Sequence, residues 1–163
     1  MVTVGDQAPE FIAPLVGDET EATAFVDHLG DGPVVLAFFP AAFSSTCTEE
    51  FCTFQDELGQ FNELGATVFG ISTDTAYALE RFRAENNLTF GLISDNNGAI
   101  IEAYDVVDDF EHIAMWEVAQ RAVFVIDSEG IVQYAWRAEN PGQQPDYDAV
   151  VEAVEELEEI EAA

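Results

Sequence analysis

Short apolar runs alternate with amphipathic segments through the middle of the chain. Runs rich in β-branched and aromatic residues predict buried strands at 34–39, 67–72, 89–93, 122–126 and 131–136. Helical spacing of apolar residues predicts helices at about 45–63, from Asp74 as N-cap through Asn86, at 98–104 and at 147–160. Strand–helix alternation, followed by two consecutive strands and a closing helix, predicts an α/β sandwich around a mixed sheet.

Three stretches have no decisive pattern. Residues 1–16 form an apolar opening segment interrupted by prolines. Residues 23–29 fit either a short strand or a helical turn. Residues 105–120, which carry His112 and Trp116, lack a clean periodicity and are expected to form a structured loop.

Candidate chemistry is concentrated where the strand at 34–39 ends. Pro40 has no N–H for a strand ladder, so the strand should stop there. The hydroxyl residues at 44–46 are candidate N-caps for the helix that follows. Cys47 then falls in the first helical turn, where free N–H groups and the helix dipole favour an anion. A cysteine held there is expected to be a thiolate near neutral pH, and therefore a nucleophile.

The charge balance is extreme, because 33 acidic residues stand against four arginines and the net charge is −29. Such a charge repels nucleic acid and anionic membranes, so neither is an expected partner. The acidic residues are spread along the chain rather than gathered in a patch for a basic partner, which is typical of proteins from halophilic archaea. Since the Debye length is about 3 Å in molar salt, the self-repulsion would be screened there. We expect the fold to be stable only in high salt.

The length of 163 residues suits a single domain, 1–163. The sequence shows neither an apolar run of membrane-spanning length nor a secretory signal, so a cytoplasmic location is expected. Any buried or catalytic cation must be one of four side chains, Arg81, Arg83, Arg121 and Arg137.

Two cysteines, Cys47 and Cys52, are the only ones in the chain. A zinc site would need two further ligands, and His28 and His112 have no recognisable zinc spacing, so no metal site is predicted. The redox spacing Cys-x-x-Cys is absent. On an ideal helix, residues five apart have Cα atoms roughly 8–9 Å apart, whereas a disulfide requires about 4.4–6.8 Å. The two cysteines can pair only if the helix unwinds locally.

The segment from Pro40 to Cys47, PAAFSSTC, matches the peroxiredoxin motif P-x-x-x-(T/S)-x-x-C. The chain also resembles that family at residues 5–11 (GDQAPEF) and 70–74 (GISTD), and at Arg121 before the run AVFVID. The resemblance covers nearly the whole chain and implies a thioredoxin-like α/β fold, with a central mixed sheet flanked by helices.

The resemblance implies that the thiolate of Cys47 attacks a peroxide and becomes a sulfenic acid. Arg121 and the Ser44 hydroxyl would polarise the peroxide, and Pro40 would shield the site from water. Glu50 would orient the arginine. Each supporting residue also has a plainer interpretation: Ser44 as a helix cap, Arg121 as a surface charge and Glu50 as an ordinary acid near a helix start.

Cys52 has two interpretations. A cysteine five residues after the peroxidatic one resembles the bacterioferritin-comigratory (PrxQ-like) subgroup, in which it resolves the sulfenic acid. Residues 103–122 and the C-terminal part resemble the AhpE-like subgroup, which can act with one cysteine, and Cys52 would then be a small buried apolar residue. The resolving role is the one we favour.

The expected activity is a thiol-dependent peroxidase that reduces hydrogen peroxide and alkyl hydroperoxides. The resemblance implies no haem, flavin or metal. Electrons would come from a thioredoxin- or glutaredoxin-like protein or from a low-molecular-weight thiol, and the protein would be a monomer or a homodimer. Two rival functions are a disulfide oxidoreductase, against which the missing Cys-x-x-Cys argues, and a redox sensor that uses the same thiol.

Overall fold

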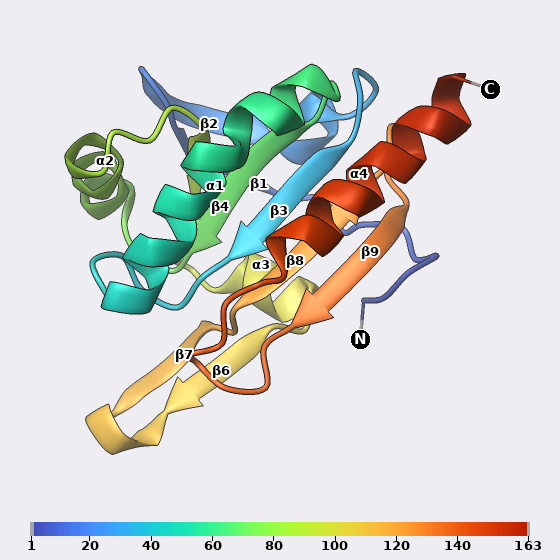
Figure 1. Ribbon diagram of the computed structural model, residues 1–163. Coiled ribbons are helices and arrows are strands. Elements are labelled where there is room, and N and C mark those ends of the chain that lie inside the picture. Colours follow the sequence, from blue (N-terminus) through green and yellow to red (C-terminus); the bar gives the residue numbers. More distant parts are fainter. Residues whose placement is uncertain (1, 163) are drawn as a thin grey trace.

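The computed structural model describes residues 2–162, so the two ends of the expected 1–163 domain lie outside it, and side chains are described as far as residue 157. A seven-stranded mixed sheet runs through the molecule in the order β2-β1-β5-β4-β3-β8-β9 (Figure 1). Its strands are β1 (Ile12–Val16), β2 (Thr20–Ala24), β3 (Val34–Phe38), β4 (Thr67–Ser72), β5 (Gly91–Ser94), β8 (Ala122–Ile126) and β9 (Val132–Arg137). The central strands β3, β4 and β5 are parallel, and the other pairs are antiparallel.

Helices cover both faces of this sheet (Figure 1). Their bounds are α1 (Ser45–Glu63), α2 (Ala76–Glu85), α3 (Ala99–Ala103) and α4 (Tyr147–Ala162), with short 3-10 turns at Phe25–His28 and Glu111–Ile113. α1, α2 and α4 share one hydrophobic core with the sheet, and α3 and the N-terminal segment pack on the opposite face. The predicted α/β class with a central mixed sheet is confirmed.

Strand β3 is buried on both faces. Val35, Ala37 and Phe39 face the core that contains α1, whereas Leu36 and Phe38 face the other core. Because both sides of the strand are covered, it has a continuous apolar sequence rather than an alternating one. This arrangement fixes the point at which the chain leaves the sheet toward α1.

Gly70 in β4 lets α1 lie close to the sheet. A Cβ atom at this position would come within 2.8 Å of both the Phe51 ring and a methyl group of Leu92. The missing side chain therefore makes room for Phe51, which is fully buried one turn after Cys47. The helix that carries the cysteine is seated by this contact.

The stretches without a decisive pattern contain regular structure. Residues 1–16 include β1, which pairs with both β2 and β5. Residues 23–29 hold the end of β2 and then a 3-10 turn, so both interpretations apply in part. The N-cap of α2 is Thr75 and not Asp74, because the Thr75 hydroxyl accepts the N–H of Ala78. Asp74 has other partners.

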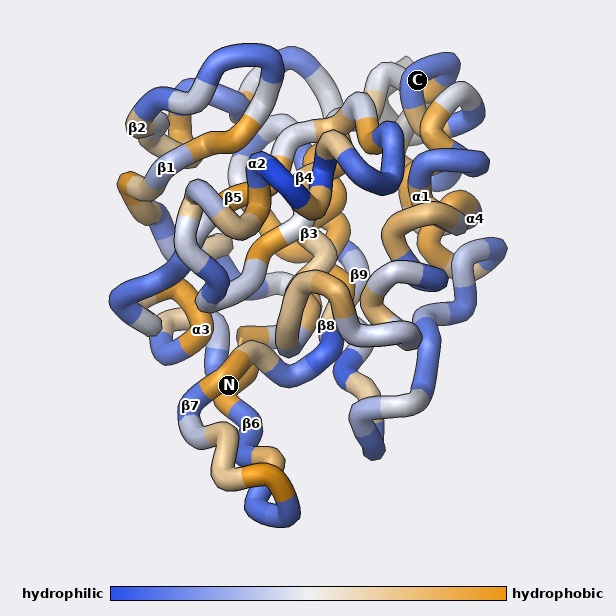
Figure 2. Tube along the Cα trace, turned by 90° about the vertical axis from the view of Figure 1, so that its left-hand side faces the viewer, coloured by the Kyte–Doolittle hydropathy of each residue, from blue (hydrophilic) through white to orange (hydrophobic). Residues whose placement is uncertain are grey.

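The loop expected at 105–120 is a β-hairpin instead, formed by β6 (Val107–Phe110) and β7 (Met115–Ala119). It extends away from the body of the molecule, and its tip carries both hydrophobic and hydrophilic residues (Figure 2). The register shifts between Asp108 and Phe110, and Ala114 and Glu117 have positive φ. A two-residue periodicity cannot persist through these irregularities, which explains why the pattern gave no strand signal.

Candidate active site

Arg121 is placed beside the end of β3 by the strand register. The antiparallel pair β3–β8 matches Phe38 with Ala122, so Arg121 lies next to Phe39 and close to Pro40. β3 ends at Phe38, one residue before the predicted end, although the Phe39 N–H still bonds to Ile71, and Pro40 lies outside the strand. Arg121 is the only buried arginine among the described residues, with 2% of it exposed. It is therefore held where the chain turns toward α1.

Cys47 lies in the first turn of α1, as expected. Ser44 is the N-cap, and its Oγ accepts the backbone N–H of Cys47 at 3.2 Å. The Cys47 side chain is fully buried. Cys47 therefore lies at the start of a 19-residue helix, where the positive end of the helix dipole favours a negative charge.

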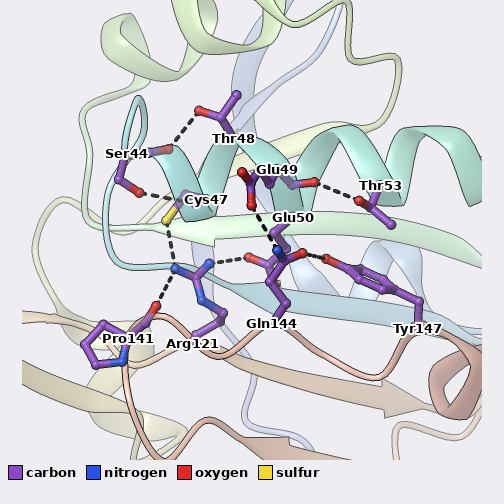
Figure 3. Close-up of polar contacts among 10 residues, drawn as sticks. All are labelled: Ser44, Cys47, Thr48, Glu49, Glu50, Thr53, Arg121, Pro141, Gln144 and Tyr147. Atoms are coloured by element: carbon purple, nitrogen blue, oxygen red, sulfur yellow. Dashed lines mark hydrogen bonds and ion pairs between the residues drawn. The ribbon is translucent and has the colours of Figure 1, made fainter.

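The guanidinium of Arg121 joins three groups (Figure 3). Its Nη1 donates to Glu50 Oε1 at 2.7 Å, and its Nη2 donates to Cys47 Sγ at 3.3 Å. Nη2 also donates to the carbonyl oxygen of Pro141 at 3.1 Å. Glu50 and Arg121 have 0% and 2% exposed side chains, so water screens this ion pair very little.

Burial sets the electrostatics of the pair. Desolvation raises the pKa of Glu50 from 4.5 to about 7, although the charge and the hydrogen bond of Arg121 act in the opposite direction. Burial opposes the positive charge of Arg121, but Glu50 and Cys47 together raise its pKa above the ordinary value. Because its pKa is raised, Arg121 stays charged beside the sulfur. Glu50 Oε2 and Arg121 Nε have no hydrogen-bond partner among the described residues.

A second set of contacts, which sequence reasoning missed, comes from the segment before α4 (Figure 3). Gln144 donates to Glu49 at 3.1 Å and accepts from the hydroxyl of Tyr147 at 2.8 Å. Burial, and then the charge of Glu50, raise the pKa of Tyr147. These residues hold the segment that carries the Pro141 carbonyl against α1.

A cavity of about 230 Å³ adjoins the site. Pro40, Ser44 and Arg121 line it, together with Phe110 and Ile113 of the hairpin. The hairpin side was not predicted, because residues 105–120 have no regular pattern. The hairpin contributes the apolar wall of this cavity, and Ser44 and Arg121 contribute its polar side.

Cys52 lies one helical turn further along α1 and is half-buried. Its Sγ is 3.8 Å from Oδ1 of Asn86 at the end of α2. Both cysteines are free thiols in one unbroken helix. Among the described residues, no three Cys, His, Asp or Glu side chains gather in a way that could hold a metal ion.

The sequence profile of the AhpC/TSA family matches residues 4–135. The putative peroxiredoxin bcp of Coxiella burnetii is 35% identical over 136 residues, which cover 83% of this chain and 88% of that one. The chain belongs to the AhpC/TSA family of peroxiredoxins. Peroxiredoxin Bcp of Bacillus subtilis is 32% identical to this peroxiredoxin over 83% of its chain and 85% of the relative.

Structural comparison agrees with this membership. The crystal structure of peroxidoxin BcpB from Mycobacterium tuberculosis superposes with a TM-score of 0.85 at 27% identity, over 96% of this peroxiredoxin and 99% of that chain. The expected thioredoxin-like fold is confirmed, as is the thiol-dependent peroxidase activity that defines the family. No described helix has both the length and the hydropathy needed to cross a membrane.

Proposed function

We propose that Cys47 is the peroxidatic nucleophile and that Arg121 and Ser44 act on the peroxide beside it. The buried guanidinium of Arg121 carries this assignment, because it reaches Cys47 Sγ at 3.3 Å while Glu50 holds its other nitrogen at 2.7 Å. A fixed cation at that distance, together with the helix start, can interact with negative charge on the sulfur during attack on the peroxide. Glu50 is a positioning residue in this scheme.

In the reaction, the thiolate of Cys47 attacks the terminal oxygen of the peroxide, so that an S–O bond forms as the O–O bond breaks. Cys47 is oxidised by two electrons to a sulfenic acid, and the leaving oxygen takes up a proton to become water or an alcohol. Arg121 and the Ser44 hydroxyl stabilise the charge that develops on the leaving oxygen. Ser44 Oγ accepts from the Cys47 N–H, and its own proton stays available for donation. Pro40 covers the site on the cavity side.

Cys52 is proposed as the resolving cysteine. Its thiol condenses with the sulfenic acid of Cys47, releases water and leaves an intramolecular disulfide. Because both residues lie in the unbroken α1, the first turns of this helix must unwind in that step. A thioredoxin- or glutaredoxin-like dithiol, or a low-molecular-weight thiol, then reduces the disulfide. Two free thiols suit a reducing, cytoplasmic compartment.

A one-cysteine peroxidase is the second candidate. The contact between Cys52 Sγ and Asn86 Oδ1 favours it, because it gives Cys52 a packing role between α1 and α2. In that case an external thiol would attack the sulfenic acid of Cys47 directly.

Peroxide consumption with a thioredoxin system, measured for the wild type, Cys47→Ser and Cys52→Ser, tests both assignments. We expect Cys47→Ser to lose all activity, and Cys52→Ser to be oxidised once by peroxide but not to turn over. Mass spectrometry after one equivalent of peroxide should find a Cys47–Cys52 disulfide in the wild type. Full turnover by Cys52→Ser would establish the one-cysteine mechanism, and peroxide oxidation of Cys47→Ser at the wild-type rate would refute the nucleophile assignment.

A further inference from the structure

Asp74 is fixed at the carboxyl end of β4 by buried hydroxyl groups. The Ser72 hydroxyl donates to Asp74 Oδ2 at 2.7 Å, and Ser72 Oγ accepts the Asp74 N–H at 3.2 Å. The Ser94 hydroxyl donates to the Asp74 carbonyl at 2.7 Å. Ser72 and Ser94 are 0% and 2% exposed, so the orientation of Asp74 is set by the rigid end of the sheet.

The Asp74 carboxylate also binds the loop between β3 and α1. Asp74 Oδ2 accepts the backbone N–H of Ala42 at 2.8 Å. Beyond Phe39, whose N–H still bonds to Ile71 of β4, the two parallel strands separate. Asp74 therefore ties the loop to the sheet after the strand ladder has ended.

The tied loop is strained at the next residue. Phe43 has a φ of 72°, a left-handed conformation that is costly for a residue with a Cβ atom. Its ring is 51% exposed and makes an edge contact with Phe82 of α2, at 5.4 Å between centroids. A loop in this conformation would relax if the bond between Ala42 and Asp74 were removed.

We propose that Asp74 is a positioning residue of the peroxidase, which holds Pro40 and Ser44 in place around Cys47 through the Ala42 N–H. Pro40 precedes Ala42 by two residues and lines the cavity, and Ser44 follows it by two residues and caps the helix of Cys47. The carboxylate acts as a hydrogen-bond acceptor and touches neither Cys47 nor the cavity. This inference rests on the roles proposed above for Cys47 and Ser44, and its effect on disulfide formation rests on the role proposed for Cys52.

The hydrogen bond between Ala42 and Asp74 should speed the oxidation of Cys47 by peroxide and slow disulfide formation with Cys52. Oxidation of Cys47 by peroxide needs the loop in place, so Asp74→Ala should slow it roughly tenfold, as expected for loss of one hydrogen bond to a charged group. Disulfide formation with Cys52 needs the start of α1 to unwind, so the same variant should accelerate that step. A variant that only lowered global stability would not separate the two rates in this way.

Rapid-quench alkylation with mass spectrometry measures both rates, from the thiol, sulfenic acid and disulfide present at each time. Asp74→Asn keeps an acceptor oxygen and should restore peroxide oxidation to within about twofold of the wild type. Ser72→Ala leaves the carboxylate but frees its orientation, and should give a smaller loss than Asp74→Ala. Asp127→Ala is the matched control, because half-buried Asp127 also accepts backbone N–H groups, in the β8–β9 turn.

Equal oxidation rates in Asp74→Ala and Asp127→Ala would overturn the proposal, and so would an Asp74→Asn variant as slow as Asp74→Ala. If Asp74→Ala does not fold, Ser72→Ala against Asp127→Ala makes the same decision. Cys47→Ser tests the nucleophile separately. If that variant is still oxidised by peroxide, the proposed function fails, whereas a normal Asp74→Ala rate with an inert Cys47→Ser refutes the positioning role alone.

Discussion

Replacing Glu50 by glutamine should change the pH dependence of folding in a definite direction. Burial raises the pKa of Glu50 from 4.5 to about 7, despite the neighbouring Arg121. A raised pKa means that the folded protein binds this proton more tightly than the unfolded chain does. The stabilisation linked to the proton is therefore complete below pH 4.5 and is lost as the pH rises through about 7.

The size of the loss follows from the same values. One pKa unit corresponds to about 1.4 kcal/mol, so Glu50 should remove about 3 kcal/mol from the unfolding free energy between pH 4.5 and 7. Glutamine carries no titrating proton and avoids this loss. Glutamine also holds Arg121 less firmly than a carboxylate does, so peroxide oxidation of Cys47 should slow about tenfold. The variant would gain relative stability toward neutral pH while it loses activity.

Urea unfolding of the wild type and Glu50→Gln, at a series of pH values in molar KCl, measures the effect. We expect the difference between their unfolding free energies to shift by about 3 kcal/mol in favour of glutamine across this range. Glu63→Gln, at an exposed position of the same helix, corrects for the change in net charge. Repeating the pair in a Cys47→Ser background removes the thiol. Parallel pH profiles for the wild type and Glu50→Gln would refute the reasoning.

Three further outcomes are expected. Gly70→Ala should lower the unfolding free energy by about 1–3 kcal/mol in urea titrations, because its Cβ would crowd Phe51 and Leu92; an unchanged value would contradict that packing. The melting temperature should rise from dilute buffer to molar KCl, since the net charge is −29, and a constant value would count against halophilic stabilisation. Phe110→Ala and Ile113→Ala should raise KM several-fold for a bulky alkyl hydroperoxide but hardly for hydrogen peroxide, because each methylene that the substrate buries against the hairpin contributes about 0.8 kcal/mol to binding. Equal effects on the KM of both substrates would show that the hairpin does not bind the substrate.

Sequence patterns predict the centre of this fold better than its margins. β3, β4 and β8 are covered on both faces, so burial alone dictates their apolar runs. β1 and β2 lie at the sheet margin, where most positions of β2 are exposed and Pro14 interrupts β1. The hairpin of β6 and β7 lies outside the main sheet and carries a bulge. Where tertiary contacts rather than burial select a strand, the local pattern carries little signal.

Arg121 marks the limit of prediction at the site. The sequence limits the candidate cations to four arginines, and only the resemblance to the peroxiredoxin family selects Arg121 among them; the structure brings this side chain to Cys47 and Glu50. The carbonyl of Pro141, which shares Nη2 with the sulfur, could not be predicted, because every residue has a carbonyl group and its use depends only on the path of the chain. That path is set by α4, whose first turn bonds through Gln144 to the helix of the cysteine. The side chains proposed to be catalytic can thus be found from sequence motifs, whereas the backbone group that completes the arginine site depends on how the last helix packs.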